Sequence, residues 1–183
     1  VPFDYTVVFG YYGAARPMDL FDNFPEEKRK VFVEDYQEGP YLLDPFFLAC
    51  GNRVEAGLYR IRDLAPDRFF QGEYFRNYYA RTGLAEEIGF FIEVSGGAII
   101  VVSLMRSEKL FSAKEFRQVS EVWPIVRAAC QRHWHDLAAQ FGKQDPTSSG
   151  SNLYQSVEQA FQNFGAGVLT PRERQVAEFT LKG

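Results

Sequence analysis

Hydrophobic residues along the chain form short β-branched and aromatic runs that are typical of strands. Five such runs cover residues 4–12, 18–23, 57–64, 88–94 and 98–106. The last two are separated only by Ser95, Gly96 and Gly97, which predicts a hairpin. Its second arm is apolar almost throughout, as expected of a central strand that is buried on both faces of a sheet.

Two helices are predicted between the second and third of these runs. Proline and acidic residues in the first turn are helix start signals, and they predict a helix from Pro25 to Tyr36. Asp44 as N-cap and Pro45 in the first turn predict a second, short helix. Gly51 stands where a C-terminal glycine is expected, so this helix should end there.

Two further helices follow the third run. Residues 66–82 predict a helix rich in Phe and Tyr, which a glycine ends. Ser112 and Glu115 form the pattern of a capping box and open a helix predicted over residues 112–141. Apolar residues fall at three- and four-residue steps along it. Pro124 lies inside this pattern and is expected to kink the helix.

The order of elements predicts an α+β fold, in which flanking helices pack on a central antiparallel sheet. Residues 1–141 should form this domain. Residues 142–152 contain no large apolar side chain and are expected to be a linker. Residues 153–183 then supply a connecting helix and the beginning of a further element. The chain is thus expected to consist of one domain, a linker and a remainder.

Composition narrows the possible classes of protein. The chain has 183 residues, of which 46% are apolar, so wholesale disorder is excluded. A net charge of -4 excludes coating of nucleic acid by charge alone. Cys50 and Cys130 are expected to be buried reduced thiols. No apolar stretch is long enough to span a bilayer and no targeting segment is recognisable, so we expect a cytoplasmic protein without a membrane partner.

The most specific motif is the sequence LTPRERQVAEFTLKG at residues 169–183. Thr170, Pro171 and Glu173 form a complete capping box, and the apolar residues after them share one helix face. This segment resembles the first helix of the helix-turn-helix DNA-binding domain of LuxR-type transcriptional regulators. The resemblance implies that the chain stops inside that domain and contains no DNA-reading residue. The alternative is a capped C-terminal helix that packs on the main domain.

The resemblance also implies a GAF/PAS-like sensory domain upstream, dimerisation, and control of DNA through the C-terminal module. Residues 121–126 (EVWPIV) resemble the proline-containing final helix of such sensors. Phe32 and Tyr36, with the Asp44–Pro45 dipeptide, resemble part of the pocket of acyl-homoserine-lactone receptors. In those receptors the aspartate accepts a hydrogen bond from the ligand amide, but their tryptophan has no counterpart here. The alternative role of Asp44 is that of a helix N-cap, and both roles can coexist.

Aromatic residues make up 16% of the chain and concentrate on the helices expected to line a ligand pocket. Tyrosine hydroxyls require partners when buried, and tyrosines beside a carboxylate suit a cationic or aromatic molecule. An amine could use Asp44, Asp63 or Glu73 as its counter-charge. The alternative is that these rings only fill the core. The candidate ligand-binding residues are Phe32, Tyr36, Tyr41, Asp44, Phe47, Asp63, Tyr74 and Tyr78.

No catalytic, metal or cofactor site is expected. His133 and His135 are two residues apart on a helix and point to different faces. The acidic pairs at 26–27 and 86–87 are interpreted as helix-start or loop charges. We therefore expect the ligand-sensing domain of a homodimeric transcription factor, with the helix at 112–141 as dimer surface and a small-molecule effector that is an amine, aromatic or acyl-lactone-like. A ligand-free interaction module and, less favoured, a small enzyme are the alternatives.

Overall fold

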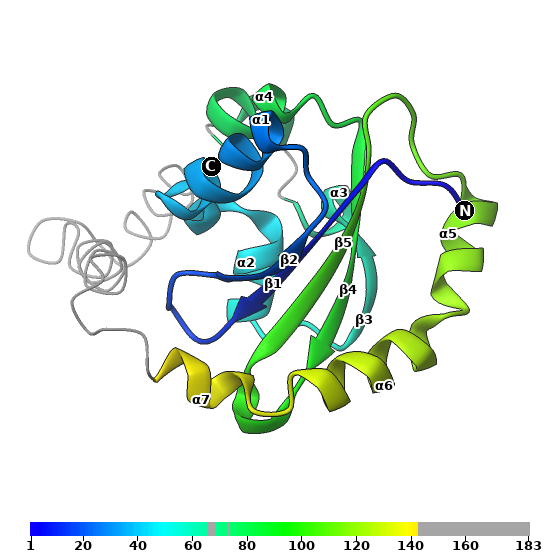
Figure 1. Cartoon of the computed structure of the whole chain (residues 1–183). Coiled ribbons are helices and arrows are strands. Elements are labelled where there is room, and N and C mark those ends of the chain that lie inside the picture. Colours follow the sequence, from blue (N-terminus) through cyan, green and yellow to red (C-terminus); the bar gives the residue numbers. More distant parts are fainter. Residues whose placement is uncertain (66–68, 73, 143–183) are drawn as a thin grey trace, which may run out of the picture.

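A five-stranded antiparallel sheet forms the centre of the computed structural model, which describes residues 1–65, 69–72 and 74–142 (Figure 1). The strand order is β2-β1-β5-β4-β3. The strands are β1 (Tyr5–Tyr11), β2 (Met18–Asp22), β3 (Gly57–Arg60), β4 (Glu86–Glu93) and β5 (Ile99–Arg106). The prediction of an α+β fold with a central antiparallel sheet is confirmed. So is the central position of β5, which pairs with β1 and β4.

Helices cover both faces of the sheet (Figure 1). The first face carries α1 (Glu26–Arg29), the π-helix η1 (Lys30–Asp35), η2 (Pro40–Leu43), α2 (Pro45–Gly51), the π-helix η4 (Phe75–Tyr79) and α4 (Ala80–Thr82). The second face carries α5 (Ala113–Ser120), α6 (Trp123–His133) and α7 (Leu137–Phe141). Short segments α3 (Ile61–Leu64), η3 (Phe69–Gln71) and η5 (Ser95–Gly97) complete the described elements. Two separate hydrophobic cores result, one on each face of the sheet.

The strand alternation assigns side chains to these two cores. Val7, Phe9 and Tyr11 of β1 lie in the core of the first face, whereas Val8 lies in that of the second face. On the first face, α2 approaches the sheet closely because β4 has a glycine beneath it. A Cβ atom at Gly89 would lie 2.7 Å from the ring of Phe46. This close packing fixes the position of α2, and with it the position of Asp44.

The predicted single helix over residues 112–141 is wrong, because the chain forms three helices there. The capping box at its start is confirmed: Ser112 Oγ accepts from the Glu115 amide at 3.2 Å. Pro124 does not kink a continuous helix but lies in the first turn of α6, where its missing N–H costs nothing. A second interruption follows at Trp134, whose φ of -113° is not helical.

Three other boundaries also differ from the prediction. Helix α2 includes Gly51 and is capped by Asn52, and the left-handed residue of this turn is Arg53. The strand predicted over residues 57–64 ends at Arg60, where α3 begins. The predicted helix at 66–82 contains 3-10, π and α segments and ends at Gly83, as expected, with a φ of 69°. Residues 66–68 and 73 of that helix lie outside the described residues.

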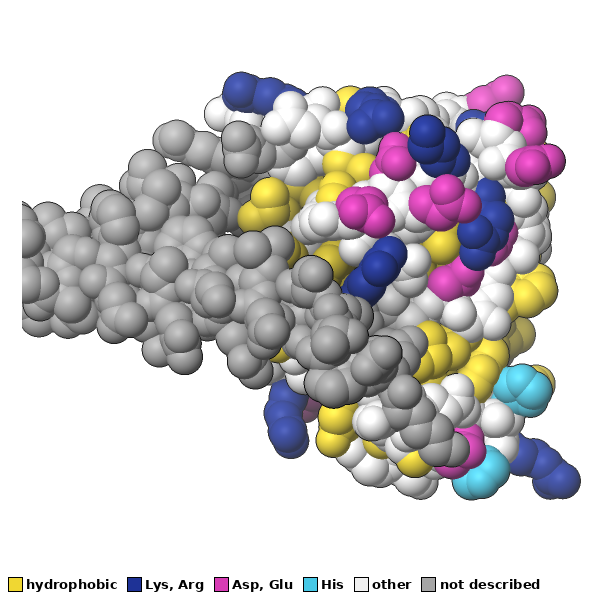
Figure 2. Space-filling model, turned by 60° about the vertical axis from the view of Figure 1, so that its left-hand side comes forward, with side chains coloured by type: hydrophobic (Ala, Val, Ile, Leu, Met, Phe, Trp, Pro, Cys, Tyr) yellow, Lys and Arg dark blue, Asp and Glu magenta, His cyan; other side chains and the backbone are white. Residues whose placement is uncertain are grey.

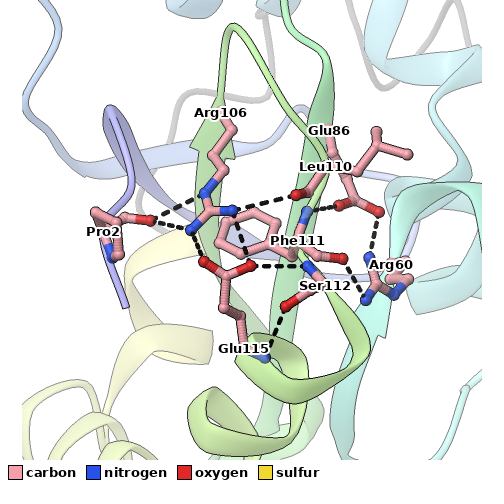
Figure 3. A network of polar contacts seen from close by, with 8 residues as sticks. All are labelled: Pro2, Arg60, Glu86, Arg106, Leu110, Phe111, Ser112 and Glu115. Carbon is pink, nitrogen blue, oxygen red and sulfur yellow. Dashed lines mark hydrogen bonds and ion pairs between the residues drawn. The ribbon is translucent and has the colours of Figure 1, made fainter.

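A network of buried charges joins the sheet to the start of α5 (Figure 3). Glu86 of β4 accepts hydrogen bonds from Arg60 of β3 and from the amide of Phe111. Arg60 also donates to the Phe111 carbonyl at 2.9 Å, and Arg62 lies 3.1 Å from the Glu86 carboxylate. Glu86 is only 2% exposed, so these partners replace the water that its carboxylate has lost.

A second arginine extends this network to the N-terminal segment of the chain (Figure 3). Arg106, at the end of β5, donates to the carbonyl of Pro2 at 2.7 Å and 3.0 Å. It also forms a bidentate ion pair with Glu115, which is the glutamate of the capping box of α5. Hydrogen bonding to Arg106 and to Ser112 lowers the pKa of Glu115 to about 2. The helices of the second face are therefore fixed to the sheet by ionic as well as apolar contacts.

Removal of Arg60 should be much more damaging than removal of Arg62, although both contact Glu86. Arg60→Met leaves a buried carboxylate with a depleted set of partners, and we expect a loss of about 3–5 kcal/mol in the free energy of unfolding. Arg62 is 41% exposed, and Arg62→Met should cost about 1 kcal/mol or less. Urea unfolding of both variants measures the difference, and equal losses would contradict this account of the network.

Candidate functional site

A small cavity of about 20 Å³ lies between the sheet and the helices of the first face. We call it the tyrosine cavity, because five tyrosines are among the residues that line it. The strands contribute Val7, Phe9, Tyr11, Glu87, Ser103 and Met105, and the helices with the turn after them contribute Phe32, Tyr36, Asp44, Tyr74, Tyr78, Tyr79, Thr82 and Leu84. The lining thus combines aromatic rings with two carboxylic acids.

Asp44 enters the cavity wall from the N-terminus of α2. Its carboxylate accepts a hydrogen bond from the Phe46 amide at 3.0 Å, so the predicted N-cap role is confirmed. The other carboxylate oxygen accepts from the hydroxyl of Tyr36 at 2.6 Å, and Tyr36 lies 3.1 Å from the hydroxyl of Tyr11. Burial raises the pKa of Asp44 to about 6, although hydrogen bonds from Tyr36, from the α2 backbone and from Tyr74 oppose this rise.

Glu87 enters the same cavity from β4. It is buried, and burial together with the negative charge of Asp44 raises its pKa to about 8, against a hydrogen bond with Ser103 that lowers it. No Lys, Arg or His is among the described residues that line this cavity. Glu87 therefore differs from its neighbour Glu86, which points to the opposite face of the sheet and meets two arginines.

The tyrosine wall opposite the sheet depends on π-helical geometry. A π-helix closes its hydrogen bonds between residues i and i+5, so residues five apart share a face. In η4 this brings Tyr74 and Tyr79 to the cavity together with Tyr78. Tyr79 is 4% exposed, and its hydroxyl has no hydrogen-bond partner among the described residues. A buried hydroxyl without a partner costs free energy, which makes it a position where a bound group is expected.

An open cleft of about 170 Å³ lies on the other side of Tyr11. Cys50, Val54, Phe91 and Ile99 are among the residues that line it, and Tyr11 lines both this cleft and the tyrosine cavity. Tyr11 is therefore shared by a surface opening and by the cavity that contains the two buried carboxyl groups. Both cysteines of the chain are buried and unpaired, as expected, and Cys50 borders this cleft.

The structure brings most of the predicted site residues together. Phe32, Tyr36, Asp44, Tyr74 and Tyr78 line the tyrosine cavity. The remaining predicted residues lie elsewhere: Tyr41 and Phe47 are buried behind the cavity, with ring centroids 5.0 Å apart, and Asp63 is exposed on α3. Glu73 lies outside the described residues.

Sequence reasoning missed Tyr11, Tyr79, Glu87 and Ser103 as cavity residues. The interpretation of residues 86–87 as loop or helix-start charges is wrong, since both lie in β4 and both are buried. The sequence did contain a signal for Glu87, namely the alternation of inward and outward residues along β4. Continuing the strand alternation backwards from Phe91 and Gly89 places Glu87 on the same face as these residues.

Residues 1–65, 69–72 and 74–142 contain neither a metal-binding cluster nor a membrane-spanning helix. Within these ranges no group of three or more His, Cys, Asp or Glu side chains could hold a metal ion. No helix in the same ranges is long and apolar enough to cross a membrane. Figure 2 shows acidic and basic side chains intermingled on the part of one face that the structure describes, so neither sign of charge forms a continuous patch there.

Comparison with known proteins defines the class. No family model matches the chain. The fold resembles the ligand-binding domain of VqsR from Pseudomonas aeruginosa (TM-score 0.63, 24% identity, 74% of this chain and 80% of that chain). It also resembles CepR2, an N-acylhomoserine-lactone-dependent LuxR-family factor of Burkholderia cenocepacia (TM-score 0.51, 15% identity, 75% and 78%). A third similar structure is SdiA of Escherichia coli in complex with octanoyl-rac-glycerol (TM-score 0.50, 15% identity, 98% and 81%).

These similarities establish a LuxR-type sensory fold, and a sequence relative establishes the family. The chain is 31% identical over 142 residues to an HTH-type transcriptional regulator in the exeN 3′ region of Aeromonas salmonicida. The match covers 76% of this chain and 72% of that protein. The chain therefore belongs to the LuxR-type transcriptional regulators.

The raised pKa of Glu87 predicts a specific pH dependence of stability. Between about pH 4.5 and 8, folded Glu87 keeps a proton that the unfolded chain releases. Its contribution to stability is therefore complete at low pH and is lost as the pH rises through about 8. Relative to Glu87→Gln, the wild-type protein should lose on the order of a few kcal/mol of unfolding free energy over this window.

Urea unfolding of both proteins from about pH 5 to about pH 9 measures this difference. Glu108→Gln, at an exposed glutamate, is the matched control and should parallel the wild type at every pH. A constant difference between the wild type and Glu87→Gln would show that Glu87 is ionised in the folded protein throughout this range.

Proposed function

We propose that this chain is the ligand-sensing part of a transcriptional regulator, and that the tyrosine cavity is its effector site. The observation that carries this proposal is a cavity whose mostly buried lining includes two carboxylic acids and a tyrosine hydroxyl that has no partner among the described residues. Burial of polar groups costs free energy unless they are hydrogen-bonded. Apolar residues would fill a purely structural core more stably, so the polar lining supports a binding role. The regulator is not proposed to catalyse any reaction.

The small volume of the tyrosine cavity favours the second candidate, a ligand-free interaction module. A volume of about 20 Å³ has room for about one water molecule. Under the ligand-sensing proposal, a larger effector must separate the first-face helices from the sheet as it binds. That requirement supplies the two conformations that a sensor needs, because an effector shifts the equilibrium only if it binds one of them better.

The response would reach DNA through the parts of the regulator that follow the described domain. We propose residues 142–152 as linker, and residues 153–183 as connecting helix and first helix of the DNA-binding domain, on the motif at residues 169–183. Binding at the first face would change how β4 and β5 support α5 to α7 on the second face. The spacing of two DNA-reading modules would change with it.

A ligand screen with paired tyrosine variants tests the effector site. Compounds that bind the tyrosine cavity should raise the melting temperature of the wild-type chain. Tyr36→Phe removes the hydroxyl that contacts Asp44 and Tyr11, and it should weaken such binding about tenfold. The control Tyr12→Phe makes the same chemical change at an exposed position and should bind like the wild type.

The same variants, placed in the full regulator, test the coupling to DNA. An active compound should change the affinity of the wild-type regulator for its operator, and Tyr36→Phe should require about tenfold more compound. If no compound stabilises the chain, and if Tyr36→Phe regulates transcription in cells like the wild type, the ligand-free module is the better description.

We propose that the regulator is a homodimer and that α6 provides the contact surface. Val122, just before α6, is 43% exposed, and Ile125 on its outer side is 72% exposed. Large apolar side chains that are neighbours and solvent-exposed are typical of protein interfaces. The predicted dimer surface at residues 112–141 is thereby narrowed to the beginning of α6.

Ile125→Glu should therefore weaken self-association at least tenfold, because a charge would be buried at the interface. Phe21→Glu is the matched control, since Phe21 is also exposed but lies on the edge strand β2. Sedimentation velocity over a range of concentrations measures both variants. A wild-type chain that stays monomeric, or a Phe21→Glu variant that is affected as much as Ile125→Glu, would overturn this assignment.

A further inference from the structure

We infer that the tyrosine cavity binds the ammonium head group of a primary amine, held between Asp44 and Glu87 with the Tyr79 hydroxyl as an additional acceptor. This inference rests on the proposed ligand-sensing function and names the chemical class of the effector. Four independent features of the cavity support it: its charge, its size, its unpartnered hydroxyl and its aromatic walls.

The ionisable carboxyl groups in the lining of the tyrosine cavity are not balanced by a basic residue among the described lining residues. Asp44 and Glu87 are both buried in the tyrosine cavity, and the described lining residues include no cation. The neighbouring Glu86 is the internal comparison, because it lies on the opposite face of the same strand and there meets the buried Arg60 and the partly exposed Arg62. On the second face the chain itself supplies the compensating positive charge. On the first face a cationic ligand would supply it, whereas an anionic ligand would meet two carboxyl groups.

The size of the cavity suits an ammonium group. A volume of about 20 Å³ holds one water-sized group, and an ammonium nitrogen with its hydrogens is of that size. The head group could therefore enter the existing space, while the rest of the amine extends toward Tyr11 and the open cleft beyond it. A guanidinium or quaternary ammonium group is larger and would require the walls to separate further.

The hydrogen-bond acceptors of the cavity also match the donors of a primary ammonium group. A primary ammonium group has three donors and no acceptor. The cavity offers acceptors on Asp44 and Glu87, and the hydroxyl of Tyr79 has no partner among the described residues. Asp44 already accepts hydrogen bonds from Tyr36, from Tyr74 and from the α2 backbone, so Glu87 and the Tyr79 hydroxyl are the acceptors with the most capacity left for a ligand. Residues with acceptor groups from three elements thus line a cavity with room for one donor group.

The aromatic walls favour the same kind of ligand. The rings of Tyr36 and Tyr78 have centroids 5.8 Å apart, and those of Tyr74 and Tyr78 are 5.4 Å apart. A cation close to several ring faces gains electrostatic stabilisation that a neutral group of the same size does not. Burial raises the pKa of each of these tyrosines, so the rings stay neutral over the physiological range.

Methylammonium is the smallest probe of this site, and the 183-residue chain is the protein to be tested. At about 100 mM, methylammonium chloride should raise the melting temperature by about 3 °C or more over sodium chloride at equal ionic strength. Tetramethylammonium has no N–H donor and exceeds the cavity, and methanol has no charge. Neither should stabilise the chain, and stabilisation by methanol equal to that by methylammonium would overturn the inference.

Variants assign the effect to the cavity. Glu87→Gln keeps the size of the side chain and removes its charge, so it should weaken methylammonium binding by about tenfold or more. Glu108→Gln, at an exposed glutamate, should leave binding unchanged. Each melting temperature is compared with that of the same variant in sodium chloride, because Glu87→Gln changes the baseline stability. Equal binding by Glu87→Gln and by the wild type would overturn the inference.

A pH series adds a readout that a merely structural role of Glu87 would not change. The titratable groups that face Glu87 are Asp44 of α2 and the tyrosines Tyr11, Tyr36, Tyr74, Tyr78 and Tyr79. Only Asp44 and Glu87 ionise between about pH 4 and 9, with pKa values of about 6 and about 8. Methylammonium stays protonated over this range, as lysine does.

A cation binds better to ionised Glu87, so its affinity should increase from about pH 6 to about pH 8.5, and protons should be released on binding near pH 7. Isothermal titration calorimetry in buffers of different ionisation enthalpy measures this release. Binding of methylammonium to Glu87→Gln should release few protons, since the glutamine side chain cannot titrate. Absence of proton release by the wild type would contradict ammonium binding at Glu87.

A neutral probe separates this inference from the proposed function. If octanoylglycerol stabilises the wild type and Glu87→Gln equally and methylammonium stabilises neither, the cavity senses a neutral ligand. The ammonium inference is then wrong, but the proposal that the tyrosine cavity is an effector site still stands. If methylammonium fails and Tyr36→Phe also regulates like the wild type, both proposals are wrong.

Discussion

Burial of two consecutive glutamates in β4 is the constraint on which the rest of the structure depends. A sheet that is covered on both faces buries neighbouring side chains on opposite sides, so Glu86 and Glu87 are only 2% and 9% exposed. Each carboxyl group needs partners within the protein. Glu86 obtains two arginines and a backbone amide, whereas Glu87 obtains a serine hydroxyl and a set of tyrosine rings. One strand thereby carries a fully compensated charge and an incompletely compensated one.

This asymmetry separates the structural task from the proposed sensing task. On the second face, Arg60 and Arg106 fix the segment before α5 to the sheet by donating hydrogen bonds to the carbonyls of Phe111 and Leu110. On the first face, the helices around Asp44 and Glu87 contain two π-helical segments, a geometry that is frequent at functional sites. Because Glu86 and Glu87 are adjacent, a displacement of β4 by the proposed binding at one face would act directly on the contacts that hold α5 at the other.

The sequence was sufficient to predict the sheet, the central hairpin, and the α2 N-cap, because these depend on local periodicity and capping. It also indicated that Phe32, Tyr36 and Asp44 lie together, because their spacing resembles a known receptor pocket, and all three line the tyrosine cavity. It was not sufficient for the interruptions at Pro124 and Trp134, since a proline fits a kink and a new first turn equally well. The π-helical segments have no recognised sequence pattern, so the convergence of Tyr74 and Tyr79 could not be foreseen. The face of Glu87 could be predicted by extending the alternation of β4 backwards, but its neighbours across the sheet depend on strand register, which only the fold defines.

The place of Tyr11 between the tyrosine cavity and the open cleft has a consequence for ligand discrimination. Its hydroxyl contacts Tyr36, and Tyr36 contacts Asp44. A molecule confined to the cavity would leave this chain of hydroxyls intact, whereas a longer molecule would displace the Tyr11 ring and interrupt it. Two molecules with the same head group and tails of different length would then leave the receptor in different states. One site of this construction could distinguish an agonist from an antagonist by length alone.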